Sequence, residues 1–315
     1  MLVVCRLPDE ILREFSGVFD LSFHPIDGIP VREELYSALR GKEIILTSVN
    51  AKFPADLIGS MPESVKAIAT YSVGLDHLDI QAARSRGVAV FNTPNVLTQS
   101  VADAALFLLL GAARRATESI ALIRGRDWDG WTARQLNGLE LAHKSLGILG
   151  MGRIGQAIAE RARGFGMSIH YHNRSRLRAD LEHAATFHAR AEDMLSQIDV
   201  LMLAAPSTAE TRGFLNTARL RDLRRGAIVV NIARGELVDD DALIAALQSG
   251  HVFAAGLDVF NNEPRIDERY LDLRNVFMLP HIGSSTVEAR QRMGAVLLQG
   301  LIEWRAGRAA ANRVV

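Results

Sequence analysis

SLGILGMGRIGQAIAERA, residues 145–162, joins an apolar run to an amphipathic stretch through a turn rich in glycine. The run at 145–149 is typical of a buried strand, and the residues after the turn have the apolar spacing of a helix. Between them GMGRIG, residues 150–155, fits the G-x-G-x-x-G pattern of dinucleotide-binding turns. The stretch therefore predicts a parallel α/β sheet in which this strand ends in a phosphate-binding turn.

The three glycines of this turn have different expected tasks. Gly150 permits a tight turn, Gly152 lets the backbone approach a pyrophosphate, and Gly155 lets the helix pack closely on the strand. Arg153 and Ile154 open the helix, whose first amides would face the phosphates. The alternative is a glycine-rich turn that binds nothing, and the flanking strand and helix argue against it. We therefore expect all five residues to contact a dinucleotide.

Short runs rich in Val and Ile alternate with amphipathic stretches along the rest of the chain, as in doubly wound α/β folds. In the first part, strands are expected at residues 1–7, 21–26, 43–48, 65–72 and 88–93, and helices at 8–15, 31–39, 54–61 and 78–87. In the second part, strands are expected at 145–150, 168–173, 199–206, 226–233, 254–260 and 275–281, and helices at 156–165 and 239–250. The sequence predicts two doubly wound parallel-sheet domains, one flavodoxin-like and one of Rossmann type.

A turn at Pro94 and a long apolar helix mark the crossing between these two domains. A last helix, at about 287–305, follows the final strand of the second domain and could pack back on the first. We therefore predict a discontinuous first domain for the substrate, residues 1–95 and 286–315, and a dinucleotide-binding domain at 96–285.

The composition narrows the class of protein. Among 315 residues, 36 basic and 36 acidic side chains cancel, so no overall field would draw nucleic acid or an anionic membrane. A single cysteine, Cys5, excludes an intramolecular disulfide framework, and the first ten residues do not resemble a signal peptide. The most apolar run, 101–113, is interrupted by Asp103 and predicts a buried helix. A cytoplasmic protein with no nucleic-acid or membrane partner is expected.

The loop after the second strand of the nucleotide domain reads HYHNRS, residues 170–175. Many such loops carry an acid that binds the adenosine ribose and would repel a 2′-phosphate. Here Asn173 stands at that position, followed by Arg174, Ser175 and Arg176, which offer two guanidinium groups and a hydroxyl to a phosphate. The loop therefore predicts NADP(H), with NAD(H) as the weaker alternative. The competing interpretation is a solvated basic loop.

Three chemically useful side chains follow successive strands of the second domain: Arg234, Glu263 and His281. Ligands bind at the carboxyl edge of open α/β sheets, where these strand ends meet. The three types suit reduction of a 2-oxo acid, because a guanidinium can hold a carboxylate and an imidazole paired with an acid can move a proton. Taken singly, Arg234 could be part of a surface ion pair, Glu263 an acid in a turn and His281 a histidine at the edge of the core. Together they predict a catalytic site that needs no metal.

The sequence resembles the D-isomer-specific 2-hydroxyacid dehydrogenases over nearly its whole length. The resemblance rests on GMGRIG, NIARGELVD, GLDVFNNEP, PHIGSST and, in the first domain, YSVGLDHLD. It implies that Arg234 binds the substrate, that His281 is the acid/base and that Glu263 pairs with its imidazole. It also implies that the backbone at Val73 and Gly74 provides amides for the substrate carboxylate.

The same resemblance implies further cofactor contacts. Asp258 would hold the nicotinamide carboxamide, and further residues in the matching segments would line the cofactor: Ala205, Pro206, Ile232, Ala233 and Gly283. The stretch around Trp128 and Trp131 falls where the family has a dimer-forming loop, so a homodimer is implied; simple packing is the alternative for these two residues.

The NRS loop and the paired Trp residues resemble the glyoxylate/hydroxypyruvate reductase branch, which implies NADPH-dependent reduction of a small 2-oxo acid to the D-2-hydroxy acid. Two alternatives stay open. One is an NAD-dependent enzyme like phosphoglycerate dehydrogenase, although many of these carry an additional regulatory domain. The other is an NAD(H)-binding interaction protein like the corepressors that share this fold. Glu263 argues against formate dehydrogenase, which replaces the acid of the pair.

Overall fold

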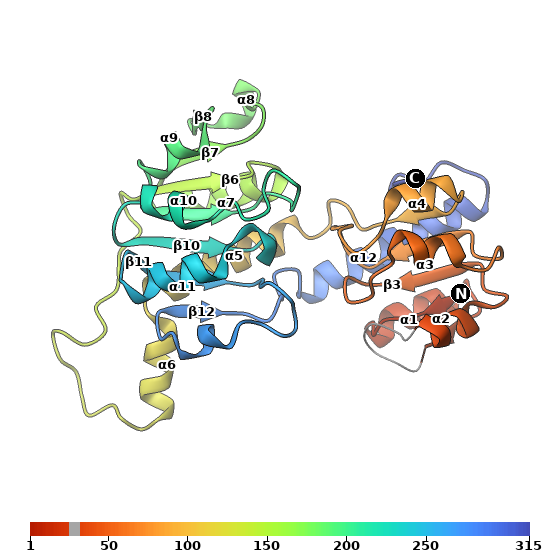
Figure 1. The fold of residues 1–315 in the computed structure, drawn as a ribbon, viewed down its shortest axis with the longest axis horizontal. Helices are drawn as coiled ribbons and strands as arrows, with labels where there is room; N and C mark the ends of the chain where they lie inside the picture. The colour runs from red at the N-terminus through yellow and green to blue at the C-terminus, as the bar shows by residue number, and fades with distance from the viewer. Residues whose placement is uncertain (25–31) are drawn as a thin grey trace. The chain divides into compact units, whose positions relative to one another are not determined.

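A computed structural model describes residues 1–24 and 32–315, and the chain forms two compact units. Unit 1 comprises Met1–Leu97 and Ser285–Val315, and unit 2 comprises Thr98–Ser284. These junctions lie two residues and one residue from those expected from the sequence. In Figure 1, α12 (Val287–Arg305), at the blue end of the chain, lies among the red and orange elements of unit 1.

Unit 1 is a five-stranded parallel sheet in the order β2-β1-β3-β4-β5, the flavodoxin-like order. Its strands are β1 (Leu2–Val3), β2 (Ser22–Phe23), β3 (Ile44–Thr47), β4 (Ala67–Thr70) and β5 (Ala89–Phe91). Besides α12, its helices are α1 (Asp9–Ser16), α2 (Arg32–Leu39), α3 (Ala55–Ser60) and α4 (Ile80–Ser85). The strand expected at 21–26 and the helix expected at 31–39 both extend into residues 25–31, which lie outside the described residues.

Unit 2 is a seven-stranded parallel sheet in the order β12-β11-β10-β9-β6-β7-β8. Its strands are β6 (Ser145–Leu149), β7 (Ser168–His172), β8 (Thr186–His188), β9 (Val200–Leu203), β10 (Ala227–Asn231), β11 (Val252–Leu257) and β12 (Val276–Met278). The order reverses between β6 and β9, which makes the switch point where ligands bind in such sheets. Both sheets are parallel and helices join their strands, so the predicted fold class is confirmed.

Helices of different lengths connect these strands. They are α5 (Thr98–Ala113), α6 (Ala116–Arg124), α7 (Arg153–Gly164), α8 (Ala179–Glu182), α9 (Ala191–Leu195), α10 (Thr217–Asp222) and α11 (Asp240–Gln248), with 3₁₀ turns η1 (Gly235–Leu237) and η2 (Glu268–Asp272). The sequence did not predict β8, which has only three residues and so no readable alternation.

The apolar run at 101–113 forms most of α5 and packs on the sheet of unit 2. A Cβ at Gly256 of β11 would lie 2.7 Å from the Leu108 carbonyl oxygen, so the helix and strand backbones are in close contact. The helix is buried over most of its length because its apolar residues point in nearly every direction. Within the described residues no helix has the length and apolar character needed to cross a membrane.

Candidate active site

The fingerprint turn connects β6 to α7, and its three glycines are in different surroundings. Gly150 has φ +95°, and a Cβ there would lie 2.6 Å from the Ala205 amide nitrogen. A Cβ at Gly155 would lie 2.4 Å from the Gly150 carbonyl oxygen, so protein packing alone requires both glycines. At Gly152 a Cβ would meet nothing within 4 Å. Packing does not require glycine there, which leaves the space beside the turn for a ligand and fits a dinucleotide.

Asn173 is part of the fingerprint turn in the structure. Its Oδ1 accepts a hydrogen bond from the Met151 amide at 2.7 Å, while the Gly150 amide donates to the His172 carbonyl at 3.0 Å. The end of β7 and the turn therefore hold each other. The residue at position 173, where the sequence predicts the ribose contact, therefore also fixes the turn.

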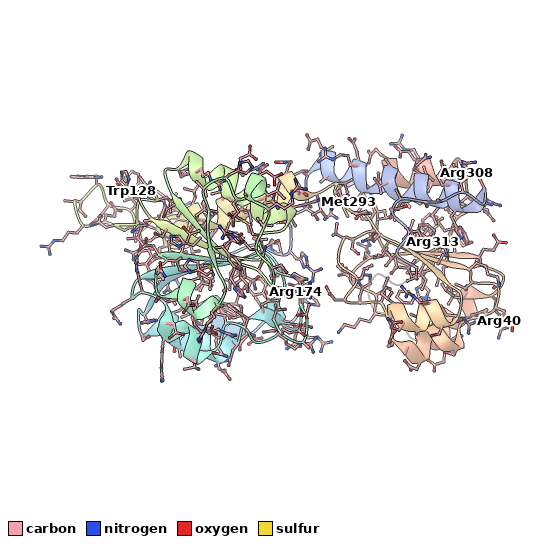
Figure 2. All side chains as sticks on the ribbon, turned by 90° about the horizontal axis from the view of Figure 1, so that it is seen from above. Arg40, Trp128, Arg174, Met293, Arg308 and Arg313 are labelled. Atoms are coloured by element: carbon pink, nitrogen blue, oxygen red, sulfur yellow. The ribbon has the colours of Figure 1, made fainter. Side chains whose placement is uncertain are left out.

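The basic loop is only partly available to a phosphate, which corrects the expectation of two guanidinium groups. Arg176 donates two hydrogen bonds to Glu182, at 2.8 and 3.0 Å, and Tyr171 donates a third at 2.6 Å. These contacts from Arg176 and Tyr171 lower the pKa of Glu182 to about 2. Arg174 is exposed on unit 2 (Figure 2), and its side chain makes no hydrogen bond within the described residues. Arg174 and Ser175 are therefore the groups left for a phosphate.

The turn that carries Arg234 is fixed by the buried side chain of Asn231. The Asn231 amide donates to the Arg234 carbonyl at 2.8 Å, and its oxygen accepts from the Ala233 amide at 3.0 Å. The turn also lies very close to the loop that carries Glu263, since a Cβ at Gly235 would lie 1.9 Å from the Phe260 carbonyl carbon. Only glycine fits here, and this close approach brings Arg234 to the loop of Glu263.

Glu263 and His281 form a direct pair. The imidazole Nδ1 lies 2.7 Å from Glu263 Oε2, and the other carboxylate oxygen accepts from the Phe260 amide at 2.7 Å. Burial works against ionisation of Glu263, but the hydrogen bonds from His281 and Phe260 and the charge of Arg234 outweigh it, so its pKa lies below the ordinary value. With Nδ1 engaged by a carboxylate, Nε2 is the nitrogen that can exchange a proton with a substrate.

His281 has a left-handed backbone, with φ of +54°, which is costly for a residue other than glycine. Three hydrogen bonds to Asp258 hold it. The His281 amide donates to the Asp258 carbonyl at 2.8 Å, and the amides of Ile282 and Gly283 donate to the Asp258 carboxylate at 2.7 and 2.8 Å. Asp258 is only 2% exposed; burial raises its pKa, and the two amides work against that rise. The structure thus shows Asp258 orienting the His281 loop, a task that the sequence did not indicate.

In unit 1 the Val73–Gly74 turn has fixed peptide planes. The Ser72 carbonyl accepts from the Thr93 amide at 2.9 Å, and the Val73 carbonyl accepts from the Asn92 side chain at 3.0 Å. In a trans peptide the N–H points away from the carbonyl, so the Val73 and Gly74 amides face away from these partners. Within the described part of the chain neither amide donates a hydrogen bond. They are oriented donors of the kind that a carboxylate can use.

The structure thus places the expected residues of unit 2 at the carboxyl ends of its strands. The fingerprint follows β6, Asn173 follows β7, and three further segments follow β9, β10 and β11: Ala205–Pro206, Ile232–Arg234 and Asp258–Glu263. His281 comes after β12. Sequence reasoning missed Asn231 and Gly235, although Gly235 stands next to Arg234 in the motif. In residues 1–24 and 32–315, no group of three or more His, Cys, Asp or Glu residues is arranged to hold a metal ion.

Comparisons with known proteins identify the family of this chain. The family model "D-isomer specific 2-hydroxyacid dehydrogenase, NAD binding domain" matches residues 106–283. Glycerate dehydrogenase of Hyphomicrobium methylovorum is 42% identical over 295 residues, 93% of this chain and 92% of the relative. Glyoxylate reductase of Thermococcus kodakarensis is 40% identical over 312 residues, 98% of this chain and 93% of the relative.

A solved structure is similar over the whole chain. It is the NADPH-dependent glyoxylate/hydroxypyruvate reductase of Sinorhizobium meliloti in complex with NADP and malonate, with a TM-score of 0.90 and 33% identity. The match covers 100% of this chain and 96% of that one. This chain therefore belongs to the D-isomer-specific 2-hydroxyacid dehydrogenase family and is an enzyme that uses a nicotinamide cofactor.

Proposed function

We propose that this enzyme reduces a small 2-oxo acid, such as glyoxylate or hydroxypyruvate, to the D-2-hydroxy acid with NADPH. The observation that carries the proposal is the Glu263–His281 pair, 2.7 Å apart, on the strand edge that also carries Arg234. The relatives of this chain include glyoxylate reductases and an NADPH-dependent glyoxylate/hydroxypyruvate reductase. The physiological direction would then be reduction.

The side chains of this site would divide the work as follows. When bound, the reduced nicotinamide supplies the hydride that adds to the carbonyl carbon. Arg234 holds the substrate carboxylate and polarises the carbonyl, and the oriented amides of Val73 and Gly74 are further donors of the kind that a carboxylate uses. His281 gives the Nε2 proton to the carbonyl oxygen, and the Glu263 carboxylate stabilises the imidazolium that is present before transfer. The product is the hydroxy acid, and the imidazole takes a new proton from water.

The preference for NADPH would rest on Arg174 and Ser175, with no acid at position 173. Removing a charge-assisted hydrogen bond to the 2′-phosphate should cost about 1.5–3 kcal/mol, or roughly ten- to a hundredfold in preference. The test is kcat/KM for NADPH and NADH in the wild type and in Arg174→Ala. A wild type that prefers NADH, or a variant that loses both cofactors equally, would contradict the assignment.

A substrate panel tests the other half of the proposal. Glyoxylate, hydroxypyruvate, phosphohydroxypyruvate and a branched 2-oxo acid should be compared by kcat/KM at saturating NADPH. The two small unphosphorylated acids should be reduced fastest. A preference for phosphohydroxypyruvate would favour the phosphoglycerate dehydrogenase alternative, and tight cofactor binding without turnover of any acid would favour an interaction protein.

We also propose that the enzyme is a homodimer. The segment after α6 extends from the body of unit 2, where Figure 2 labels Trp128, and Trp128 and Trp131 are 53% and 82% exposed. Ile120 and Ile123 on α6 are exposed as well, so this part of the surface carries more large apolar groups than a monomer usually leaves in water. Sedimentation equilibrium should give a dimer mass, and Trp131→Ser should weaken the association.

A further inference from the structure

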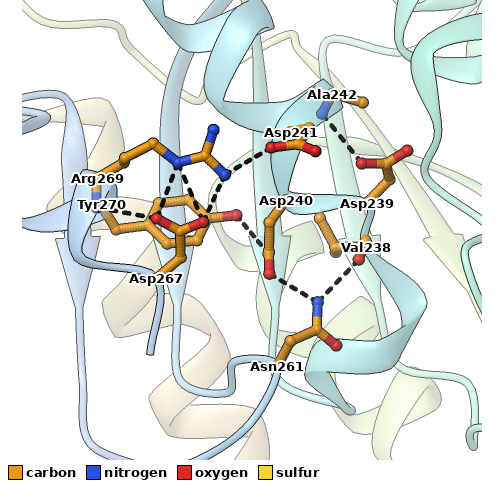
Figure 3. Close-up of polar contacts among 9 residues, drawn as sticks. All are labelled: Val238, Asp239, Asp240, Asp241, Ala242, Asn261, Asp267, Arg269 and Tyr270. Carbon is orange, nitrogen blue, oxygen red and sulfur yellow. Dashed lines mark hydrogen bonds and ion pairs between the residues drawn. The ribbon is translucent and has the colours of Figure 1, made fainter. Parts of the chain in front are cut away.

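Asn261 lies on the loop that carries Glu263 and bonds to the segment that follows the Arg234 turn. Figure 3 shows its side-chain amide donating to Asp240 Oδ2 at 2.8 Å and to the Val238 carbonyl at 3.1 Å. Both protons of the amide are therefore used, and both acceptors belong to the segment that runs from Arg234 into α11. One side chain thus joins the loops that carry two of the three catalytic groups.

Asp240 is itself held from its other oxygen. The phenol of Tyr270 donates to Asp240 Oδ1 at 2.8 Å, as Figure 3 shows. Tyr270 is only 1% exposed, and burial, together with the charge of Asp240, raises its pKa, so the phenol stays a donor over the working pH range. The acceptor for Asn261 is therefore fixed by the core of unit 2 and by the first turn of α11.

The backbone next to Asn261 contacts the segments that carry Arg234 and Glu263, so the position of Asn261 affects both catalytic groups. On one side, the Phe260–Asn261 peptide is in contact with Gly235, the residue after Arg234. On the other side, the Phe260 amide holds the Glu263 carboxylate, whose second oxygen meets His281. A shift of this peptide would therefore change the separation of Arg234 from the Glu263–His281 pair.

We infer that Asn261, fixed by Asp240, is a positioning residue that sets the distance between Arg234 and the Glu263–His281 pair. The inference rests on the proposed function, in which these three groups act on one carbonyl. Such a residue affects turnover because reacting groups misplaced by about 1 Å can lose around a hundredfold in rate.

The neighbouring ion pairs supply a matched control. Arg269 donates to Asp241 of α11 at 2.6 Å and to Asp267, the residue before η2, at 2.5–3.1 Å in the same cluster, and none of these bonds involves Asn261 or Asp240. Arg269→Gln therefore disturbs the same surface and the same helix start while leaving the Asn261–Asp240 contact. Exposed ion pairs contribute little to stability, so the control should fold like the wild type.

The experiment compares Asn261→Leu, Asp240→Asn and Arg269→Gln with the wild type. Leu keeps the size of Asn but donates no hydrogen bond. Asp240→Asn removes one of the two oxygens with which Asp240 accepts hydrogen bonds from Asn261 and Tyr270. We expect kcat for glyoxylate to fall on the order of tenfold or more in Asn261→Leu and less in Asp240→Asn, with NADPH affinity nearly unchanged. We also expect the acid side of the kcat profile to move to higher pH, because a Glu263 that loses its His281 contact titrates nearer its ordinary range.

A second measurement does not need turnover. In protein labelled with 15N-histidine, the Nδ1–H signal of His281 is identified as the one that disappears in Glu263→Gln. The same signal should weaken in Asn261→Leu. If Asn261→Leu melts earlier but keeps the wild-type kcat, pH profile and His281 signal, the residue is structural only and the inference is wrong. If Arg269→Gln shows the same losses, the effect is general and the inference is also wrong. If the wild type reduces no 2-oxo acid, the proposed function fails, while the His281 signal still tests the positioning.

Discussion

A single methyl group at Gly235 should separate the catalytic groups of unit 2. In Gly235→Ala the new Cβ would lie 1.9 Å from the Phe260 carbonyl carbon and 2.2 Å from the Asn261 amide nitrogen, whereas ordinary contact begins at 3.4 Å. The two backbones must therefore move apart by roughly 1.5 Å at this point, because neither is a flexible side-chain end. Arg234 is on one of them and Glu263 follows the other, so the movement separates the guanidinium from the proton donor.

The expected result follows from this distance. A misplacement of that size should lower kcat/KM for 2-oxo acid reduction about a hundredfold, and overpacking should lower the free energy of unfolding by about 1–3 kcal/mol. The assay is steady-state reduction of glyoxylate together with thermal unfolding followed by circular dichroism. NADPH affinity, measured by fluorescence, should change little because the fingerprint turn is not touched.

Gly164→Ala is the matched control for this prediction. It makes the same substitution at the exposed end of α7, where a Cβ would meet nothing within 4 Å. Alanine should raise helix stability there by roughly 0.5–1 kcal/mol and leave the kinetics unchanged. A Gly235→Ala enzyme that is folded and keeps the kcat/KM of the wild type would refute the argument that this close approach sets the catalytic geometry.

Three further predictions concern neighbouring residues. Asp258→Asn should leave one of the Ile282 and Gly283 amides without an acceptor, at a cost of about 1–3 kcal/mol, and should lower kcat more than cofactor affinity; a loss mainly in cofactor affinity would instead favour the contact with the carboxamide. Asn173→Asp keeps an acceptor for the Met151 amide and adds a charge that repels a 2′-phosphate, so kcat/KM should fall with NADPH and rise with NADH. Burial opposes ionisation of Glu263, but His281 holds the pKa of Glu263 below its ordinary value. The Glu263–His281 contact should therefore stabilise the folded state fully above the ordinary pKa range of a glutamate, and this stabilisation should disappear as pH falls through the lowered pKa. Acid unfolding of Glu263→Gln, which does not titrate, should lack this component; a curve parallel to the wild type would contradict the pairing.

The sequence alone determined the fold class and the edge of the sheet at which the site lies. Strand and helix periodicities are local patterns, and in a parallel sheet every strand ends at the same edge, so the order of motifs placed Arg234, Glu263 and His281 there without knowledge of contacts. GMGRIG was informative for the same reason, because its spacing and the strand and helix on either side of it are local features of the sequence. The two-residue difference at the first domain junction reflects the weak local signal of a domain crossing.

The tertiary structure decided which partners the polar side chains have. Arg176 donates to Glu182, the Asp258 carboxylate accepts from the amides after His281, and Asn261 donates to Asp240, 21 residues before it in the chain. None of these pairings follows from residue type or spacing, since the first depends on how one loop folds onto α8 and the other two depend on how closely separate loops approach. That approach is set by the register of the strands and by space that only glycine leaves, as at Gly235. The sequence therefore determined which groups lie at the carboxyl edge, and packing between loops determined how they are held.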